Sequence, residues 1–423
     1  MAFLGMLGTG DFTADERPQS WREGILFEYP NGVAPLTAIL SKMASNRVDD
    51  THYHWWTQKL PDESATITGI YTDVALATAY VNGTAVTAED IFYLKMSAAD
   101  ESKFRAGVTV YITLTTDTSQ YLHARVDAVN ANGASSYLKI IALEAVAKID
   151  GSDYVEIIGT SNAQGADRPT AQTWPLTEYD NYTQIFRDST DMTRTAMQTR
   201  LRTADSRRKA RREALQAHAV RMEKAMIFGQ AYTRTGTNGQ PETFTRGIVP
   251  FVQQYAPQNW KSFTRDNVGT TWLSGGDDWL DGVLETIFSY GNTEKLALCG
   301  AGVLTGLSKL AKANGVVNLV PRQVDYGLQI VEWITDHGIL YLMSDPIFTQ
   351  YSIRKHSMLI TQPNELTFKY LQDTIFKGDE AFNNDWSTTT GKDGLNEEFL
   401  TEAGLGIDFP DHHGYLENIG QNG

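Results

Sequence analysis

The sequence predicts a mixed α+β protein, and three observations support this class. Short runs rich in Val, Ile, Thr and Tyr follow one another from Thr66 to about Thr160. A long stretch of helix-forming residues without Pro or internal Gly then runs from Asp191 to Gly229. Beyond it, helical and strand patterns are mixed. With 423 residues, 41% hydrophobic and 21% charged, the chain is long enough for two or three globular units.

Residues 1–62 show no clear period and mix Gly, Pro and aromatic residues. A segment of this kind cannot bury a core of its own, so we expect it to lie on another domain or on another subunit. Its beginning turns acidic quickly and lacks a basic region, so no signal peptide is predicted. No apolar run approaches the roughly 18 residues of a membrane helix. We therefore expect synthesis in the cytoplasm and no membrane partner.

The region from residue 66 to residue 160 reads as strands joined by tight turns. Turn dipeptides separate the strand-like runs at Asn82-Gly83, Asn132-Gly133 and Asp150-Gly151. Such dipeptides provide the positive φ values that two-residue hairpin turns need. We expect an antiparallel β unit, either a small barrel or an extended hairpin with additions. Residues 161–181 are polar, contain Pro and show no period, which predicts a linker.

The stretch from Asp191 to Gly229 predicts a single long helix that stops at the glycine. At 1.5 Å per residue it would extend about 50 to 60 Å. A compact domain cannot surround a helix of this length on all sides, so we expect part of it to extend beyond the domain as a strut. One helix face is expected to carry the apolar side chains Met197, Leu201, Ala204, Leu215, Met222 and Met226.

A basic cluster interrupts this face, and it consists of Arg207, Arg208, Lys209, Arg211 and Arg212. Residues 191–229 carry ten Lys and Arg against four Asp and Glu, a net charge of +6 within a chain of net charge −15. Like charges four residues apart destabilise a helix, so an anionic group is expected to lie against the cluster. Three possibilities stay open: a solvated face, acidic surfaces of neighbouring subunits, or nucleic-acid phosphate. The acidic chain as a whole argues against a general nucleic-acid coat.

The part of the chain that follows the long helix alternates between helix and strand patterns. FTRGIVPFV predicts a strand, and WLSGGDDWLDGVLETIFSYG predicts an amphipathic helix with an apolar face of Leu280, Val283, Leu284 and Ile287. A further helix is expected over 301–313. Later strands are predicted at LQIVEWIT, GILYLMS, SMLITQ and LTFKYLQ. Residues 379–417 are acidic, with ten Asp and Glu and one Lys.

Few residues have side chains and spacings that suggest catalysis or metal binding, and the sequence predicts no catalytic, cofactor or metal site. His52 and His54 lie on one face of a strand pattern, and His412 and His413 are adjacent, but without nearby ligands of known spacing both pairs are interpreted as surface or interface histidines. The single cysteine, Cys299, lies in an apolar, Gly-rich setting typical of a buried structural thiol. The chain is therefore not expected to be an enzyme.

Three segments, in this order, resemble the major head proteins of tailed bacteriophages, which have the Hong Kong 97-type capsid fold. They are NYTQIFRD at 181–188, VDYGLQIVEWITDHGILYLMSDPIF at 324–348 and EAGLGIDFPDHHGYLENI at 402–419. The resemblance implies five regions: an N-terminal arm (1–62), an extended loop with a β insertion (63–165), a linker and peripheral domain with the spine helix 191–229 (166–244), an axial domain with peripheral strands (245–375), and a C-terminal peripheral segment (376–423).

The function that this resemblance implies is a major capsid protein of the virion. Copies of the chain would assemble in the host cytoplasm, as hexamers and pentamers, into an icosahedral shell around double-stranded DNA. Decoration, scaffold and portal proteins are further implied partners. The spine helix faces the inner shell surface in this fold, which would place the basic cluster near DNA or a neighbouring subunit. Two alternatives stay open: a carbohydrate-binding or carbohydrate-active β protein, and a cellular shell that encapsulates a protein cargo.

Overall fold

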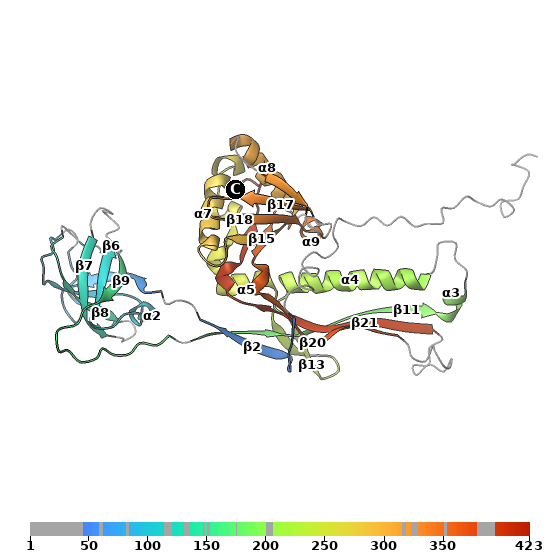
Figure 1. The fold of residues 1–423 in the computed structure, drawn as a ribbon, viewed down its shortest axis with the longest axis horizontal. Coiled ribbons are helices and arrows are strands. Elements are labelled where there is room, and N and C mark those ends of the chain that lie inside the picture. Colours follow the sequence, from blue (N-terminus) through green and yellow to red (C-terminus); the bar gives the residue numbers. More distant parts are fainter. Residues whose placement is uncertain are drawn as a thin grey trace, which may run out of the picture. The chain divides into compact units, whose positions relative to one another are not determined.

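The computed structural model describes most of the chain, namely residues 45–58, 62–81, 84–113, 121–130, 135–146, 149, 153–174, 176–199, 206–314, 319–323, 329–350, 353–378 and 394–423. These residues form two compact units. One is the continuous segment Trp56–Thr177, and the other comprises the residues on either side of it. Helices and sheets occur together, so the predicted α+β class is confirmed (Figure 1).

The inserted unit, Trp56–Thr177, is built on one seven-stranded antiparallel sheet in the order β3-β9-β6-β7-β8-β5-β4. Its elements are β3 (Ser64–Thr66), β4 (Gly69–Tyr71), β5 (Ile91–Lys95), α2 (Ala98–Glu101), β6 (Val108–Thr113), β7 (Tyr121–Asn130), β8 (Tyr137–Ala142) and β9 (Tyr154–Thr160). Strands β3 and β4 are separated by two residues of chain yet lie at opposite ends of the sheet, so the sheet curls until its ends meet. The antiparallel β unit expected from the sequence is confirmed, in its barrel form.

Buried and partly exposed side chains alternate along the strands of the inserted unit, and the buried ones form a core of its own. In β6 the side chains of Val108, Val110 and Ile112 are buried, and in β7 those of Leu122 and Ala124 are buried, while the residues between them are at least partly exposed. A period of two places every second side chain on the inner face of the curled sheet. The barrel interior is therefore filled with apolar side chains.

The second unit contains a four-stranded sheet in the order β1-β20-β21-β11, along which helix α4 lies (Figure 1). Its elements are β1 (Ser45–Arg47), β11 (Gln184–Thr193), α3 (Arg194–Gln198), α4 (Ser206–Phe228), β20 (Leu366–Lys377) and β21 (Gly394–Ile407). Two small sheets belong to the same region: β2 (His52–Thr57) pairs with β10 (Thr177–Tyr182), and β12 (Tyr232–Thr235) pairs with β13 (Pro241–Phe244).

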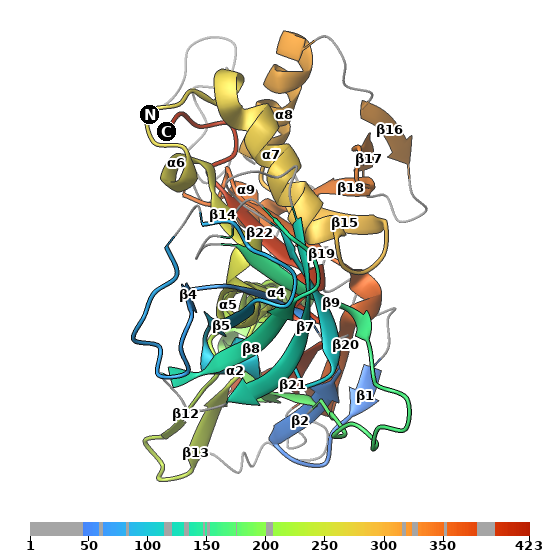
Figure 2. The ribbon, with the colours of Figure 1, turned by 90° about the vertical axis from the view of Figure 1, so that its left-hand side faces the viewer.

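The rest of this unit is a seven-stranded mixed sheet with helices packed on it (Figure 2). The strand order is β14-β22-β19-β15-β18-β17-β16, with parallel pairs at β14-β22 and β15-β18. The strands are β14 (Trp260–Ser262), β15 (Glu294–Cys299), β16 (Leu319–Gln323), β17 (Gln329–Ile334), β18 (Ile339–Ser344), β19 (Met358–Thr361) and β22 (Gly414–Glu417). The helices are α5 (Ile248–Tyr255), α6 (Phe263–Asp266), α7 (Trp272–Phe288), α8 (Ala301–Asn314) and α9 (Pro346–Thr349), with short 3-10 turns η2 (Pro257–Asn259), η3 (Pro363–Glu365) and η5 (Pro410–His412).

Most predicted elements of this region are confirmed. Helix α7 buries the predicted apolar face of Leu280, Val283, Leu284 and Ile287, and α8 begins at Ala301 as expected. The four strand-like runs after residue 328 form β17, β18, β19 and the start of β20. In each case one face or the whole segment is apolar, which is the pattern that burial against a sheet requires.

The predicted helix 191–229 is wrong at its beginning. Strand β11 continues to Thr193, a short helix α3 follows, and α4 begins only at Ser206; residues 200–205 lie outside the described residues. The β-branched threonines of this stretch fit an extended backbone, and the Thr193 hydroxyl caps α3 by accepting from Ala196 N. With 23 residues, α4 extends about 34 Å, well short of the predicted length.

The predicted end of this helix is confirmed, because α4 stops at Phe228 and Gly229 follows it. A side chain at residue 229 would place its Cβ 2.4 Å from the carbonyl oxygen of Ala225 and 2.5 Å from that of Thr245. Both neighbours are backbone and cannot move aside cheaply, so only glycine lets the chain leave the helix here.

The strand predicted at FTRGIVPFV is also wrong, since residues 248–255 form α5. Ile248, Val249, Phe251 and Val252 are all buried, and an apolar run buried on every side shows no period that separates helix from strand. Pro250 lies in the first turn, where its missing N–H breaks no helical hydrogen bond. The linker predicted over 161–181 is wrong at its end, where β10 begins at Thr177.

Candidate basic interface on helix α4

The predicted basic cluster occupies the first two turns of α4. No acidic residue lies in the first helical turn. The amino end of a helix already carries partial positive charge from aligned peptide dipoles, so cations there are unfavourable unless an anion compensates them. The helix dipole thus adds to the repulsion among the five basic side chains, and both effects favour an anionic partner for the cluster.

Glu397, on β21, is the partner that the structure provides. Its carboxylate accepts from both Arg207 and Arg211, with Arg207 Nε at 3.1 Å and Arg211 Nε at 2.5 Å. The Glu397 side chain is 2% exposed, and the two arginines are about one third exposed. Burial alone would raise the pKa of Glu397, but the guanidinium groups of Arg211 and Arg207 bring it below its usual value. Part of the cluster is thus neutralised by a carboxylate of the same chain. The sequence did not predict this pairing.

The cluster divides into two faces. Arg207 and Arg211 point to the sheet, four residues apart, whereas Arg208, Lys209 and Arg212 are exposed. The Lys209 ammonium lies 3.7 Å from Glu213, one turn later on the same helix. We call the three exposed residues the outer stripe of α4. The structure therefore brings the five predicted residues together on one helix but gives them two different surroundings.

About two turns beyond Arg211, a network of buried polar side chains links α4 to the sheet. His218 Nδ1 lies 2.8 Å from Asp188 Oδ2, and its Nε2 lies 2.8 Å from Thr401 Oγ1. Thr374 Oγ1 is a further 2.8 Å from Thr401 Oγ1. Burial lowers the pKa of His218, which favours the neutral ring. A carboxylate can only accept, so His218 donates to Asp188 and accepts from Thr401, which accepts from Thr374.

The face of α4 that packs on the sheet differs from the predicted one. Met222 and Met226 are buried as expected, but Leu215 is 46% exposed, so its predicted place is wrong. Met197 belongs to α3, while Leu201 and Ala204 lie outside the described residues. The face on the sheet is polar toward the amino end of α4 and apolar toward its carboxyl end. It carries Arg207, Arg211, His218, Met222 and Met226.

The histidine pairs also have separate surroundings. His52 and His54 pair with carboxylates on β10 and are partly exposed, in line with the surface interpretation. His413 is fully buried within the chain, so its interpretation as a surface or interface histidine is wrong. Its ring nitrogen Nδ1 lies 2.9 Å from Thr361 Oγ1, and burial lowers its pKa to about 3. Within the described residues, no group of three or more His, Cys, Asp and Glu side chains is arranged to hold a metal ion.

Cys299 is buried, as expected. Burial raises the pKa of its thiol to about 12, which leaves almost no thiolate at neutral pH. A nucleophile needs the thiolate form, so this environment fits a structural residue.

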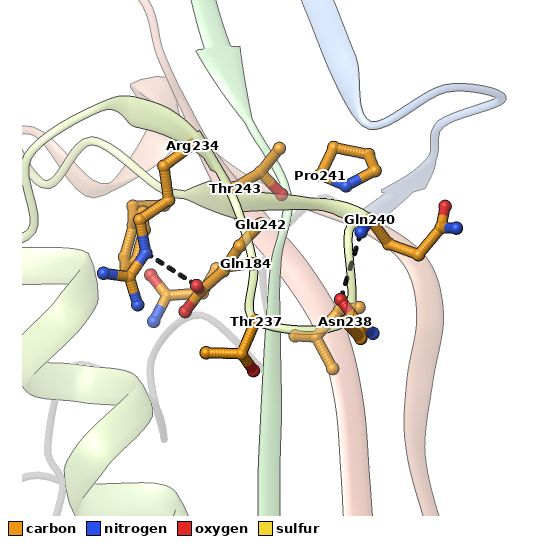
Figure 3. A pocket seen from close by; sticks show the side chains of 11 residues that line it. Gln184, Arg234, Thr237, Asn238, Gln240, Pro241, Glu242 and Thr243 are labelled. Carbon is orange, nitrogen blue, oxygen red and sulfur yellow. Dashed lines mark hydrogen bonds and ion pairs between the residues drawn. The ribbon is translucent and has the colours of Figure 1, made fainter.

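An open pocket of about 460 Å³ lies between β11 and the β12–β13 hairpin (Figure 3). Polar side chains line it, and a contact of 2.7 Å from Arg234 Nε to Glu242 Oε2 joins facing residues of the hairpin, as Figure 3 shows. Gln240 N donates to Asn238 Oδ1 at the hairpin tip. None of the five cluster residues lines this pocket.

The helices of the described residues were considered as membrane spans only by their length and hydropathy. None of them is both long and apolar enough to cross a bilayer.

A comparison with protein families identifies the chain. A family model described as SU10 major capsid protein matches residues 20–420. The chain belongs to the SU10 major capsid protein family. The major capsid protein of Pseudomonas phage PaMx41 is 26% identical over 357 residues, which cover 83% of this chain and 78% of that protein.

Similarity to solved structures is more distant. A structure from Mycobacterium phage Cain gives a TM-score of 0.46 at 9% identity and covers 95% of this chain and 92% of its own. One from Microbacterium phage Oxtober96 gives 0.45 at 11% identity, covering 98% and 99%. The SrpI encapsulin complex of Synechococcus elongatus gives 0.39 at 13% identity, covering 58% and 76%.

An SU10 major capsid protein forms the shell of a phage head. The resemblance to phage major head proteins with a mixed helix-and-sheet capsid fold is therefore confirmed. The family match decides among the predicted functions in favour of the phage head shell. The chain is thus a component of the virion and assembles with copies of itself.

Proposed function

We propose that this SU10 major capsid protein forms an icosahedral shell of hexamers and pentamers that encloses the double-stranded DNA of a tailed phage. The family match supports this proposal, as does the order of the three resembling segments. Assembly in the host cytoplasm and contacts with decoration, scaffold and portal proteins belong to the same proposal. So does the division into arm (1–62), extended loop (63–165), peripheral and axial regions, which stays a prediction. The role is structural, without catalysis or cofactor.

The outer stripe of α4 is proposed to contact packaged DNA. The observation that carries this proposal is the division of the basic cluster: Glu397 neutralises one face, while Arg208, Lys209 and Arg212 remain exposed on the other. The stripe lies at the helix end where the peptide dipoles add positive potential. In a chain of net charge −15, a phosphate backbone needs such a local patch to approach.

The test replaces two stripe residues by acids, as Arg208→Glu with Arg212→Glu. Each lost phosphate contact removes about 0.9 from the slope of log affinity against log salt, so subunit binding to duplex DNA should lose about 2 from that slope. Shells of the variant should assemble normally and hold less DNA. A matched control with the same change in charge is Arg234→Glu with Arg265→Glu, at two exposed arginines elsewhere on the surface.

The outcomes separate the three possibilities for the cluster. If variant subunits fail to form empty shells while the control forms them, the stripe contacts a neighbouring subunit and not DNA. If both variants package a normal amount of DNA, the stripe is a solvated face. Failure of wild-type subunits to form shells at all would instead contradict the shell proposal itself.

A further inference from the structure

Helices α7 and α8 lie on the same face of the seven-stranded mixed sheet and pack against each other (Figure 2). Their buried sides share one hydrophobic core with strands β15, β18, β19 and β22. Their outward sides are exposed, and the charged side chains on them differ in sign between the two helices. The second unit thus presents an anionic and a cationic helix next to each other.

The outward side of α7 is acidic. It carries four exposed acids, Asp277, Asp278, Asp281 and Glu285, and the helix contains no Lys or Arg. Asp277, Asp281 and Glu285 follow one another four residues apart, and like charges at this spacing destabilise a helix. Burial raises the pKa of Asp281, and so do the charges of Asp277 and of Asp336 in the turn between β17 and β18. We call the four residues of α7 its acidic stripe.

The helix dipole does not account for the acidic stripe. Carboxylates are favourable at the amino end of a helix, but the first turn of α7 has no acidic residue. Glu285 lies in the last turn, where the dipole already places partial negative charge. In the described part of the chain, no side chains are arranged as a metal site that would include the stripe. A cationic protein surface therefore fits the stripe better than a single ion.

The outward side of α8 is such a surface. Lys309 and Lys312 are exposed and lie one turn apart, and α8 contains no Asp or Glu. No carboxylate among the described residues pairs with either ammonium. Lys312 lies in the last turn, where the helix dipole favours a cation, but Lys309 lies before it. The two lysines thus carry charge that the described chain leaves without a counter-charge.

We propose that the acidic stripe of α7 binds Lys309 and Lys312 of a second copy of the chain. The inference rests on the proposed shell, since it names surfaces through which neighbouring copies meet. Every copy presents both surfaces, so each copy supplies the cations that the next one needs. The surfaces differ, so the contact is heterologous, and a heterologous contact that repeats by rotation closes into a ring. Two acidic stripes repel each other, which disfavours other arrangements of the copies.

Charge exchange in the full-length protein tests this contact. Asp281→Lys with Glu285→Lys places lysines against lysines, so the subunit concentration needed for shell assembly should rise about tenfold or more. Lys309→Glu with Lys312→Glu should weaken assembly to the same extent. The four changes together restore opposite charges and should restore assembly, because the two surfaces act on each other. Sedimentation and electron microscopy measure the fraction of subunits in shells.

The matched control is Glu156→Lys with Asp167→Lys, which makes the same charge change at two exposed acids of the inserted unit. It should assemble as wild type does. Unchanged assembly of either double variant in α7 or α8 would overturn the proposal, and so would a quadruple variant that stays unassembled. Failure of wild-type subunits to form shells would instead contradict the shell proposal.

A milder variant covers the case in which charge reversal in α7 prevents folding, which thermal unfolding detects. Asp281→Asn with Glu285→Gln removes the two charges and adds none. The loss of two exposed ion pairs should raise the concentration needed for assembly about two- to tenfold. Assembly of this variant at the wild-type concentration would refute the contact.

Discussion

At the scale of single residues, Glu397 is the acid on which the amino end of α4 depends. It is almost fully buried and accepts hydrogen bonds from two arginines that are about 190 residues away in sequence. A pairing of this kind is set by the tertiary fold. The sequence predicts that the arginines need an anion, but a carboxylate in the adjacent pair Glu397 and Glu398 carries no local mark that distinguishes it.

Replacement of Glu397 by Gln should therefore destabilise the protein. The change removes a buried carboxylate that two arginines share next to the positive end of a helix, and it is expected to cost about 2 to 4 kcal/mol of unfolding free energy. Glu398→Gln is the control: Glu398 pairs with Arg187, which is 61% exposed, so the cost should stay within about 1 kcal/mol. Urea unfolding of both variants provides the measurement, and equal costs would contradict the assignment.

The pH dependence of the same variant follows from the lowered pKa of Glu397. An acid with a lowered folded pKa stabilises the fold above its unfolded value, near 4.3, and loses this contribution as the pH falls through the folded value. The difference in stability between wild type and Glu397→Gln should thus be constant from pH 7 to about pH 5 and shrink in stronger acid. A difference that grows on acidification would show that Glu397 is not held in its ionised form.

Lys295 has the opposite behaviour, because it is a buried base. The residue is 1% exposed, its ammonium donates to the carbonyl oxygens of Tyr290 and His412, and burial lowers its pKa to about 8. The charged form is therefore disfavoured by folding. Relative to Lys295→Met, wild type should gain up to about 3 kcal/mol as the pH rises from about 8 to 10.5. Parallel stability curves for the two proteins across this interval would refute the prediction.

At the scale of elements, sequence patterns predicted those segments best that have one apolar and one polar side. The buried face of α7 and the strands of the inserted unit follow directly from their periods. Patterns failed where burial is uniform, as in α5, and where an extended backbone continued into the beginning of a run of helix-forming residues, as in β11 up to Thr193. The partition of the basic cluster was not predictable either, because it depends on which side of α4 meets β21.

Two glycines, one that follows helix α4 and one inside helix α7, test whether close backbone contacts require glycine at the end of α4. Gly229→Ala should destabilise the protein by about 1 to 3 kcal/mol or more, since the new Cβ meets two backbone carbonyl groups. Gly282→Ala, inside α7, meets nothing within 4 Å and should stabilise the protein by about 0.5 to 1 kcal/mol. Thermal unfolding of the two variants should shift in opposite directions. A shift of both in the same direction would contradict the close approach at residue 229.

At the scale of the whole molecule, the two units have separate hydrophobic cores, so we expect their unfolding to be separable. Leu122→Ala opens a cavity in the core of the inserted unit and should lower the stability of that unit by about 3 to 5 kcal/mol. Leu298→Ala is the matching change in a core of the other unit. Calorimetry should show two transitions, with each variant lowering a different one. A single transition that both variants lower equally would indicate one cooperative core.

The pairing of β2 with β10 has a consequence for how this capsid protein was built. The inserted unit begins at Trp56 on β2 and ends at Thr177 on β10, and these two strands are hydrogen-bonded to each other. The beginning and the end of the unit therefore lie on neighbouring strands, about 5 Å apart. A tight turn could close that gap after the whole unit is removed, and any other domain with adjacent termini could take its place. The β2–β10 pair is thus a position at which the inserted unit could be exchanged while the sheets of the other unit keep their hydrogen-bond ladders.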